Sequence, residues 1–535
     1  MTYSLSPLTS VLGLRRAKHL LRRASFSYSK DTLQDLSIMT PSEALVFLSI
    51  DSNDILSDPF EDLNNEYLMN ATEGQRRAYV TAWWWYNTSF QNSIKHKLSY
   101  FIFTSFTVSN GNGAGPSIYF YDYVRLLKFY ALGSIKTFAK KITLDNAMLR
   151  YLDNTDNNAN NPNENYAREF LELFTILKGP QISEGDYTNY TELDVQQAAK
   201  VFTGFKRQVD RSIIDPDTNI PSGFNNIAKH DTSDKVFSAA FNYHVIAGQS
   251  SAEGMLQELD DFVEMIFAQE ETAKSYCRKL YRFFVKSEWD DSVENQIITP
   301  LAQELVSNNF ELLPTVKTLL SSQHFYDYDN EDNTDQIVGS IIKSPLQLLN
   351  EVISFFDIPV PNPATFLDDY YNKFFRKFLY NSYFPSSGMP FFSPETVAGY
   401  PAHYQEPSFD RHWFSSNTIV SRYKLIESLI AGRNKISPNA LIMMQIDTVA
   451  FVENNIQNPS IISELVSELA DYLYSEEIGS SRRDYFIQLT LDGYEEYYWT
   501  ISWNDYVSTG DDVIVRNRLN ALVTGMVNAG EFQLM

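Results

Sequence analysis

The sequence predicts a mainly α-helical protein: a large multi-helix globular body with long ordered loops and at most a small β-hairpin. Three observations predict this fold class. Several segments combine an N-cap residue, an acid in the first helical turn and apolar residues spaced by three and four. Hydrophobic residues make up 44% of the 535 residues, which is enough to bury a sizeable core. Alternating apolar and polar runs, the pattern typical of strands, are scarce.

Two helical patterns stand out near the N-terminus. Thr40-Pro41-Ser42-Glu43 offers an N-cap, a proline at the first helical position and an acid at the third. A long helix is expected from Glu73 to Phe106, and it contains Trp83, Trp84 and Trp85 in succession. Because three adjacent side chains cannot share one helix face, this helix should be buried on several sides. Core packing is the favoured interpretation of the tryptophans, and a sugar-stacking platform is the alternative.

The best-defined element is a helix over residues 162–178. Asn161 caps it, Glu164 occupies its third position and Gly179 ends it. One face is apolar, and the opposite face has charged residues at intervals of four, a spacing that favours ion pairs. These charged residues are Glu164, Arg168 and Glu172.

The remaining chain is predicted to alternate helices with irregular segments. A capped helix opens at Thr191-Glu192-Leu193-Asp194 and runs to about Gly204, whereas residues 205–250 look irregular. Within Tyr485–Trp503, Asp492-Gly493 separates two apolar-rich stretches and marks a possible hairpin. Further helices are expected at 253–268, 271–286, 293–308, 313–322, 344–356, 415–432 and 459–475.

Two regions are expected from these patterns. Residues 1–375 form a main helical body. Residues 376–535 form a covering loop plus a C-terminal helical region packed on the same body. The covering loop, residues 376–414, contains so many aromatics that it should be ordered.

The chain is acidic, with a net charge of −24. Such a protein repels phosphate backbones, so nucleic-acid binding through a broad basic surface is not expected. A basic cluster near the N-terminus is the exception, and the solvated side of an amphipathic helix is its favoured interpretation. The alternative is a docking patch for an acidic partner or for the chain's own acidic bulk. The cluster consists of Arg15, Arg16, Lys18, Arg22, Arg23 and Lys30.

Signals for a cellular compartment are few. The single cysteine, Cys277, lies among apolar residues and is expected to be buried, so neither a disulfide nor a cysteine zinc site is predicted. No apolar run approaches the roughly 18–20 residues that a membrane span needs. The N-terminus lacks an uninterrupted apolar stretch followed by a cleavage site, so the cytoplasm is expected.

Few residue patterns indicate a specific chemistry. The seven histidines show no metal-site spacing, and neither a Gly-x-Ser-x-Gly elbow nor a nucleotide fingerprint is present, so no cofactor is identified. His230 and Asp231 place an imidazole beside a carboxylate, which could act as acid, base or ligand, although a loop-fixing turn is favoured. Glu164, Glu169 and Glu172 could supply a catalytic carboxyl if buried, although a structural salt-bridge face is favoured.

Several sequence blocks resemble a known family. NPNENYAREFLELFTILKGP, followed by YTNYTELDVQQAAKVFTGF, resembles the signature of the bacterial family called domain of unknown function 1800. The resemblance covers nearly the whole chain and is strongest to members found in Bacteroidota. Other blocks agree in the same order, namely residues 17–29, 230–235, 271–285, 319–325, 342–349 and 393–407.

The resemblance implies a mostly helical bacterial protein without an established activity. Members are often encoded beside a sulfatase-like protein, which is therefore a possible partner. Many relatives are exported, so the periplasm or cell surface is the alternative compartment. Both features suggest work on envelope or extracellular polysaccharide.

One motif departs from the family. Members usually carry a Trp-His-Asn-His-Phe run, but the matching stretch here is Ile102–Phe106, with Phe103 and Ser105 in place of the two histidines. His96 replaces a glutamate a few residues earlier. Other polar motif positions persist and are the candidate binding residues: His19, Asn163, Arg168, Asp194, Asp231, Lys235, Arg278 and Arg282.

Three functions are compatible with these residues. The preferred one is a binding or scaffold component that works with a partner protein in bacterial envelope or polysaccharide-related processes. The alternative is a hydrolase acting on an envelope glycan or its substituents, with Glu164, Glu172 and His230 as candidate acid/base groups and Arg168 or Arg282 holding an anionic substrate. The hydrolase hypothesis predicts that His230 and Glu164 lie in one pocket. A third is a metal-binding protein using His19, His230 and acids of the 163–172 helix.

Overall fold

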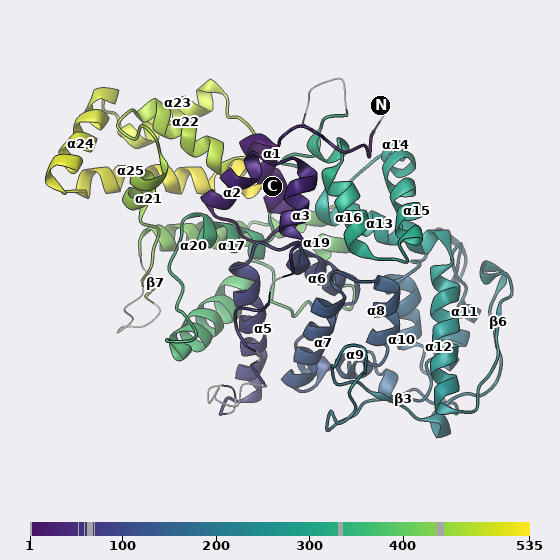
Figure 1. Ribbon diagram of the computed structural model, residues 1–535. Helices are drawn as coiled ribbons and strands as arrows, with labels where there is room; N and C mark the ends of the chain where they lie inside the picture. The colour runs from purple at the N-terminus through teal and green to yellow at the C-terminus, as the bar shows by residue number, and fades with distance from the viewer. Residues whose placement is uncertain are drawn as a thin grey trace.

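Helices make up most of the computed structural model, which describes residues 3–51, 53–57, 59, 60, 68, 70–329, 335–432, 434, 435 and 443–535 (Figure 1). The prediction of a mainly α-helical fold is confirmed. Strands in these residues form four two-stranded antiparallel pairs, whereas at most one small hairpin was expected. The pairs are β1 (Gln181–Ser183) with β2 (Asp186–Tyr187), β3 (Phe205–Lys206) with β4 (Phe224–Asn225), β5 (Lys235–Val236) with β6 (Val245–Ile246), and β7 (Asn434–Lys435) with β8 (Met443–Met444).

The N-terminal helices are α1 (Gly13–Ala24), α2 (Lys30–Ser37) and α3 (Pro41–Leu48). α3 has the predicted capping box. The Thr40 hydroxyl accepts from the backbone N–H of Glu43, and the Glu43 carboxylate accepts from that of Thr40. Further along the chain, α7 (Ser117–Tyr130) packs against α8 (Ile135–Ile142) and α9 (Asn146–Tyr151).

Half of the basic cluster is not the solvated helix face that was favoured, whereas Arg15 is exposed and Arg16 half-buried. Lys18, Arg22 and Arg23 on α1 are buried, and they donate to backbone carbonyls of the C-terminal region. Lys18 reaches Asp471 in α22 (Ile462–Leu473), Arg22 reaches Leu473 at 2.7 Å, and Arg23 reaches Met535. Figure 1 shows the C-terminus lying beside α1. The cluster therefore binds the chain's own C-terminal region, which was the less favoured alternative.

The long helix expected over residues 73–106 is two helices, α5 (Glu73–Ser89) and α6 (Ile94–Ser105). The chain turns between them because Ser93 caps α6 by accepting from the Lys95 N–H. The three tryptophans of α5 are buried, as predicted, and pack on different partners. Trp83 contacts Tyr121, Trp84 contacts Phe392, and Trp85 contacts Phe374.

Helices expected in the later part of the chain are present with ends shifted by a few residues. They are α11 (Glu192–Val201), α12 (Ala252–Phe267), α13 (Glu270–Phe284), α15 (Thr299–Ser307), α16 (Leu312–Ser321), α17 (Pro345–Phe355) and α20 (Thr418–Ile430). α14 (Asp291–Val293) and the π-type η6 (Glu294–Ile298) precede α15. The C-terminal helices are α21 (Thr448–Asn455), α22, α23 (Ser480–Leu491), α24 (Glu496–Thr509), α25 (Val513–Asn528) and α26 (Gly530–Gln533).

Three predicted elements need correction. The helix expected over residues 162–178 is shorter and is divided into α10 (Asn165–Glu169) and a π-type segment, η3 (Phe170–Phe174). Asn161 does not cap it, since Asn161 instead bridges to Asn158. The expected hairpin around Asp492-Gly493 is a helical one, because α23 and α24 flank left-handed backbone at both residues.

The third correction concerns the covering loop. Its first residues belong to a wide π-type helix, η8 (Asp369–Tyr383), which packs against α5 and continues into α18 (Phe384–Ser386). The remainder is ordered irregular chain with α19 (Pro401–Tyr404) and the 3-10 helix η9 (Phe409–Trp413). The division of the chain at residue 375 stays a prediction.

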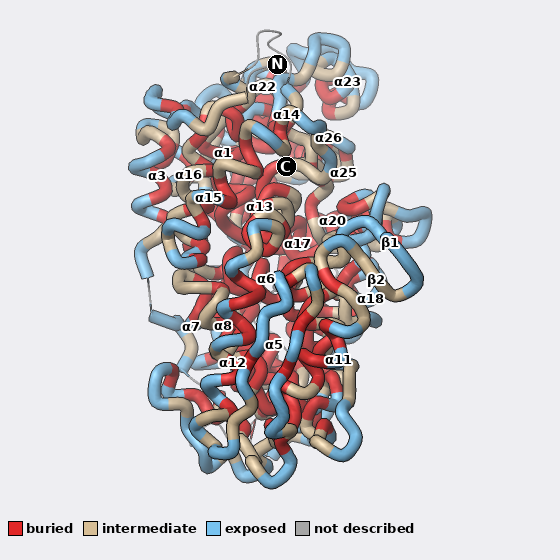
Figure 2. The backbone as a smooth tube through the Cα atoms, turned by 90° about the vertical axis from the view of Figure 1, so that its right-hand side faces the viewer, coloured by how far each residue is buried: buried red, intermediate tan, exposed pale blue. Residues whose placement is uncertain are grey.

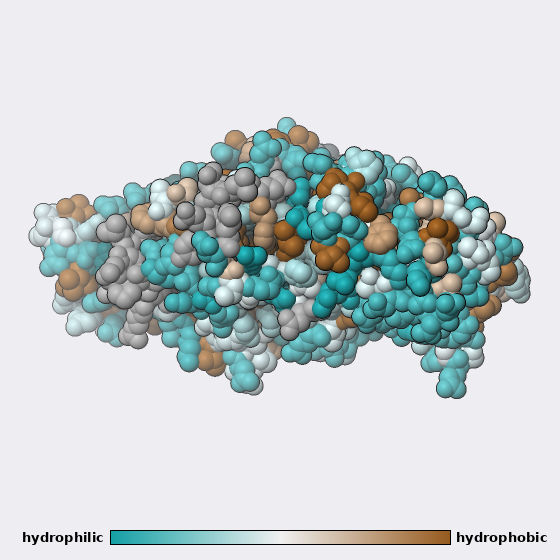
Figure 3. Space-filling model, turned by 90° about the horizontal axis from the view of Figure 1, so that it is seen from below, coloured by the Kyte–Doolittle hydropathy of each residue, from teal (hydrophilic) through white to brown (hydrophobic). Residues whose placement is uncertain are grey.

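One hydrophobic core cluster runs from Leu8 to Phe532, and Figure 2 shows buried backbone through the length of the molecule. The face in Figure 3 is mostly hydrophilic, with hydrophobic residues in small groups. In the described part of the chain, no helix combines the length and apolar character needed to cross a bilayer. Cys277 is buried, as expected.

Candidate functional site

Four segments that lie far apart in the sequence meet around a cavity of about 590 Å³. They are the end of α6, residues 172–178 after α10, the C-terminal half of α13, and the loop 397–406. Three of these segments lie in sequence blocks that resemble the family, and the end of α6 carries the block that departs from it. The residues that line the cavity are Phe101, Thr104, Ser105, Glu172, Leu173, Leu177, Lys178, Ser275, Arg278, Lys279, Arg282, Phe283, Val397, Ala398, His403, Tyr404 and Glu406.

Side chains of α13 hold the end of the π-type segment η3 in place. The Tyr276 hydroxyl donates to the Phe174 carbonyl at 2.7 Å, and the Lys279 amino group donates to the Leu173 carbonyl at 2.6 Å. The Ser275 hydroxyl donates to the Thr175 carbonyl at 2.5 Å. These bonds satisfy carbonyls that a helix leaves free at its C-terminus. They fix one wall of the cavity.

The charged groups of the cavity differ in whether they have partners. Arg278 forms ion pairs with Glu271 and Glu294, and Lys178 forms one with Glu172. Arg282 forms none within the described residues, and its Nε has no hydrogen-bond partner there. Its guanidinium instead lies 4.1 Å from the ring centroid of Phe409 and 5.2 Å from that of Trp289. Burial lowers the pKa of Arg282 to about 10, so the group stays charged at neutral pH.

Two further groups have pKa values shifted by their surroundings. Burial, with a smaller contribution from Arg282, lowers the pKa of the Lys279 amino group to about 7. Burial, then the charges of Arg282 and Lys97, lowers the pKa of His403 to about 4. His403 is therefore neutral at physiological pH, and its Nε2 has no hydrogen-bond partner in the described chain.

Three of the residues predicted for a site line this cavity, namely Glu172, Arg278 and Arg282. Sequence reasoning missed Ser105, Lys178, Lys279, His403 and Glu406, which also line it. All five lie in or beside the sequence blocks discussed above. Their position near those blocks was the only sign in the sequence that they could belong to a site. The spacing along the chain gave no indication that the blocks meet.

The polar residues at the start of α10 serve the helix and its neighbour. Arg168 bridges Glu164, at 3.0 Å, and Glu192 on α11, at 2.6 Å. Asn163 accepts from the Asn165 N–H at 2.9 Å and so starts the helix. The favoured interpretation of a salt-bridge face therefore applies to Glu164 and Arg168. Catalytic roles for Glu164, Glu172 and His230 stay predictions.

His230 and Lys235 belong to a buried network away from Glu164. Both contact one carboxylate, that of Glu258 on α12, with His230 Nε2 3.2 Å from Oε1. His230 Nδ1 lies 2.8 Å from the Thr203 carbonyl, and so donates to it. Asp231 accepts from the Ser233 N–H, which fixes the loop. These contacts match the loop-fixing interpretation, and none joins His230 to Glu164.

Asp194 and His19 also have structural partners. Asp194 completes the predicted capping box of α11 with Thr191 and accepts from the Ser238 N–H at 2.7 Å. His19 donates from Nε2 to the Phe325 carbonyl at 3.1 Å, and burial lowers its pKa well below the usual value. No group of three or more His, Cys, Asp or Glu side chains in the described residues could hold a metal ion.

Phe103 and Ser105, the two positions of the departing motif, face different surroundings. Phe103 is buried against Phe392, with centroids 4.7 Å apart, whereas Ser105 lines the cavity and its Oγ has no partner among the described groups. Residues two apart on a helix point about 200° apart, which explains the difference. A histidine at 105 would face the cavity, and one at 103 would not.

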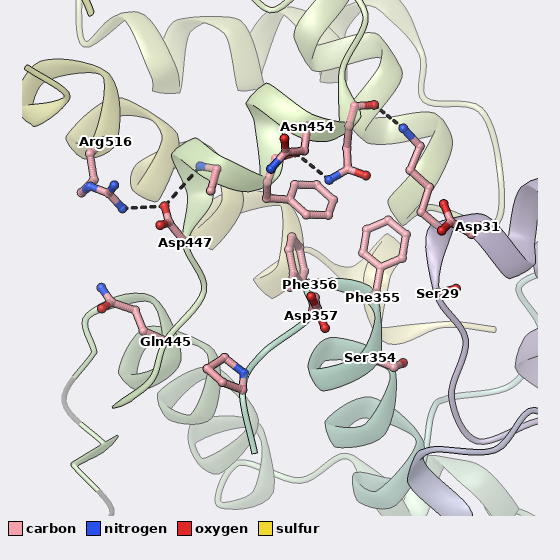
Figure 4. Close-up of a pocket in the computed structure, with 15 residues that line it drawn as sticks. Ser29, Asp31, Ser354, Phe355, Phe356, Asp357, Gln445, Asp447, Asn454 and Arg516 are labelled. Atoms are coloured by element: carbon pink, nitrogen blue, oxygen red, sulfur yellow. Dashed lines mark hydrogen bonds and ion pairs between the residues drawn. The ribbon is translucent and has the colours of Figure 1, made fainter. Parts of the chain in front are cut away.

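A second cavity, of about 670 Å³, lies between the start of α2, the end of α17 and α21 (Figure 4). None of the predicted site residues lines it. Both of its cations are already engaged, since Arg516 pairs with Asp447 at 2.9 Å and Lys30 donates to the Asn455 carbonyl. Its other charged groups are the carboxylates of Asp31 and Asp357. We therefore place the candidate site at the cavity around Arg282.

Comparison with known proteins agrees with the sequence blocks. The model of a family described as a protein of unknown function (DUF1800) matches residues 19–534. No curated protein and no solved structure matches the chain.

Proposed function

The chain belongs to the DUF1800 family of proteins of unknown function, and from this premise we propose that it is a binding component that holds an acidic saccharide. The ligand occupies the cavity around Arg282. Its carboxylate or sulfate group pairs with the guanidinium, and the process served is one of the bacterial envelope or its polysaccharides.

The unpaired guanidinium of Arg282 is the observation that carries this proposal. The chain contains 67 acidic residues against 43 lysines and arginines, so acidic partners are plentiful. A partly buried charge without a partner costs several kcal/mol. An anionic ligand would supply the missing charge and so recover that free energy on binding.

The size and lining of the cavity support a saccharide as the ligand. Its volume of about 590 Å³ is in the range of small-molecule sites. Phe101, Phe283 and Tyr404 provide aromatic surface for a sugar ring, and Arg278, Lys279 and Lys178 add positive charge.

Calorimetric titration of the purified protein with glucuronate and with glucose 6-sulfate tests the proposal. We expect binding of at least one of them, weakened about tenfold or more by Arg282→Gln, because a hydrogen bond to a charged group contributes about 1.5–3 kcal/mol. Glucose should bind equally weakly to both proteins. Lys274→Gln is the matched control, since Lys274 is on the same helix but pairs with Glu270 outside the cavity. Equal affinity of Arg282→Gln and the wild type for both acids would contradict the proposal.

A partner protein is part of the proposed function. By family resemblance, the partner is a sulfatase-like protein encoded beside this one, and a protein that presents a sulfated saccharide would suit such an enzyme. Purification of the tagged chain from its native host should recover this partner. Recovery of the chain alone would count against it.

The compartment follows from the same proposal. A role with envelope polysaccharide requires the periplasm or the cell surface. We propose that the chain lies in one of these two compartments. Fractionation of native cells, followed by immunodetection, should find the chain outside the cytoplasm.

The alternative function is hydrolysis of an envelope glycan or its substituents. One observation favours it: Glu172, a predicted acid/base residue, lines the same cavity as Arg282. Release of a reducing sugar or of sulfate by the wild type, and its loss in Glu172→Gln, would support a hydrolase over a binding component.

A further inference from the structure

A second, smaller space adjoins the cavity that contains Arg282. It measures about 50 Å³, and Arg282, Phe283 and His403 line both spaces. Tyr100, Ala402 and Trp413 are among the residues that complete this inner chamber. The two spaces therefore lie on either side of the same three side chains, with the smaller one enclosed by aromatic residues.

Polar atoms without partners gather along this path. The hydroxyl of Tyr100, Nε of Arg282, Nε2 of His403 and the hydroxyl of Ser105 have no hydrogen-bond partner among the described residues. The Tyr100 side chain is buried, with only 3% of the residue exposed. Buried polar groups are almost always hydrogen-bonded, so a cluster of exceptions indicates a missing partner.

An acceptor would satisfy all four groups, of which only Arg282 Nε–H is restricted to donating. The Tyr100 and Ser105 hydroxyls and Arg282 Nε–H can all donate, and neutral His403 donates from Nε2 in one of its tautomers. Among the buried atoms without a partner, no carboxylate or carbonyl oxygen lines either space. Burial lowers the pKa of Arg282, and the charge of the exposed Glu406 carboxylate, which lines the larger cavity, partly offsets that shift. A group with several acceptor atoms and a negative charge satisfies these donors together.

Other charged groups of the inner chamber are already engaged. Asp410 accepts from the Ser287 hydroxyl and from the Ile342 N–H. Lys97 donates to Gln347 Oε1 at 2.6 Å and lies 4.2 Å from the ring centroid of Phe26. Because Asp410 and Lys97 already have partners, Arg282 is the charged group of the chamber that is left to bind a ligand.

The volume limits what the inner chamber can hold. At about 50 Å³ the chamber is far smaller than the cavity of about 590 Å³ beside it, so we assign it one small polar group and not a sugar ring. The ring must stay in the larger cavity.

From this geometry we infer that the acidic saccharide binds head first, with its oxyanion in the inner chamber between Tyr100, Arg282 and His403 and its ring in the larger cavity. The inference rests on the proposed function and adds the orientation of the ligand. Carboxylate and sulfate share the chemistry required here, and the two probes below distinguish them.

Tyr100→Phe tests the orientation, because it removes only the unpaired hydroxyl. Since that hydroxyl has no partner among the described residues, the melting temperature should be unchanged. Titration with glucuronate and glucose 6-sulfate should show about a tenfold rise in dissociation constant for whichever acid the wild type binds, the usual effect of losing one hydrogen bond to a charged group. The acid bound more tightly by the wild type identifies the head group.

The control is Tyr121→Phe. Tyr121 also has a buried hydroxyl without a partner in the described chain, but it lines a different cavity. Its loss should leave both dissociation constants unchanged. If Tyr100→Phe binds like the wild type while Arg282→Gln binds weakly, the inner chamber does not hold the head group, although the proposed function stands. If the wild type binds neither acid, the proposed function fails and the orientation fails with it.

Discussion

Arg22 and Arg282 both lie in blocks that resemble the family, yet their surroundings differ. Arg22 is fully buried, and the Glu351 carboxylate, the Ser475 hydroxyl and the Leu473 carbonyl accept its hydrogen bonds. Arg282 has aromatic neighbours and no acid paired with it in the described part of the chain. Because desolvation of a cation must be compensated, Arg22 serves the fold, whereas Arg282 is the group to which we assign the proposed ligand.

Lys279 should make ligand binding depend on pH. Its pKa of about 7 means that it is charged at pH 6 and mostly neutral at pH 8.5. An anion is held more tightly when this charge is present, so affinity should fall as pH rises, by roughly threefold to tenfold for an interaction of about 1 kcal/mol. The charged or titratable groups that share the cavity are Glu172, Lys178, Arg278, Arg282, His403 and Glu406.

Titration with the better acid at pH 6 and pH 8.5 measures this effect. Lys279→Gln carries no charge at either pH, so its affinity should change less between the two values than that of the wild type. Identical pH profiles for the two proteins would show that another group is responsible.

Among the elements, the π-type segment η3 has the largest consequence for the site. A wider helical turn changes the direction of the side chains that follow it. Arg168 therefore pairs with Glu164 and Glu192, and not with Glu172 as a regular helix would allow. Glu172 pairs with Lys178 and lines the cavity.

Gly204, which follows α11, should not tolerate a side chain. Its φ is +84°, and a Cβ would lie 2.7 Å from the Asn226 carbonyl oxygen and 3.1 Å from the His230 nitrogen. Gly204→Ala should lower the free energy of unfolding by about 2–4 kcal/mol, from left-handed strain and overpacking together. Urea denaturation measures the loss.

Gly510, at the end of α24, is the matched control for that substitution. Its φ is +77°, but a Cβ there would have no atom within 4 Å. Gly510→Ala should therefore cost only the backbone strain, roughly 1–2 kcal/mol. Similar losses for the two variants would mean that the close approach of Asn226 is relieved by a small backbone shift.

For the whole molecule, buried charges join segments from both ends of the chain. Glu351 on α17 pairs with Arg22 at 2.6 Å and with Lys343 at 2.8 Å, and accepts from the Tyr28 hydroxyl. Arg22 also reaches the end of α22. The N-terminal helix, α17 and the C-terminal region are thereby held together through one carboxylate.

Glu351→Gln should destabilise the whole protein. The amide keeps the shape but leaves Arg22 and Lys343 without a compensating charge, a change that typically costs about 3–5 kcal/mol. Chemical denaturation should show this loss. Glu270→Gln, which breaks an exposed pair with Lys274, should cost less than about 1 kcal/mol. Comparable losses for the two variants would mean that the buried network contributes little.

The sequence by itself determined features that depend on neighbouring residues. Capping boxes at Thr40 and Thr191 and the burial of three adjacent tryptophans follow from residues a few positions apart. The mainly helical fold and the family follow from the sum of such local patterns. Local patterns did not reveal the break between α5 and α6 or the π-type segment, because these depend on packing against other helices.

Only the tertiary structure decided which polar residues share a site. Glu351 meets Arg22 across 329 positions, and Glu258, which local patterns did not single out, joins His230 and Lys235 in a buried network. Arg282, Ser105 and His403 lie in separate blocks and converge on one cavity. The reason is physical: a helix pattern reports which face is apolar, whereas a cavity arises from how several helices pack, and that depends on contacts distant in sequence.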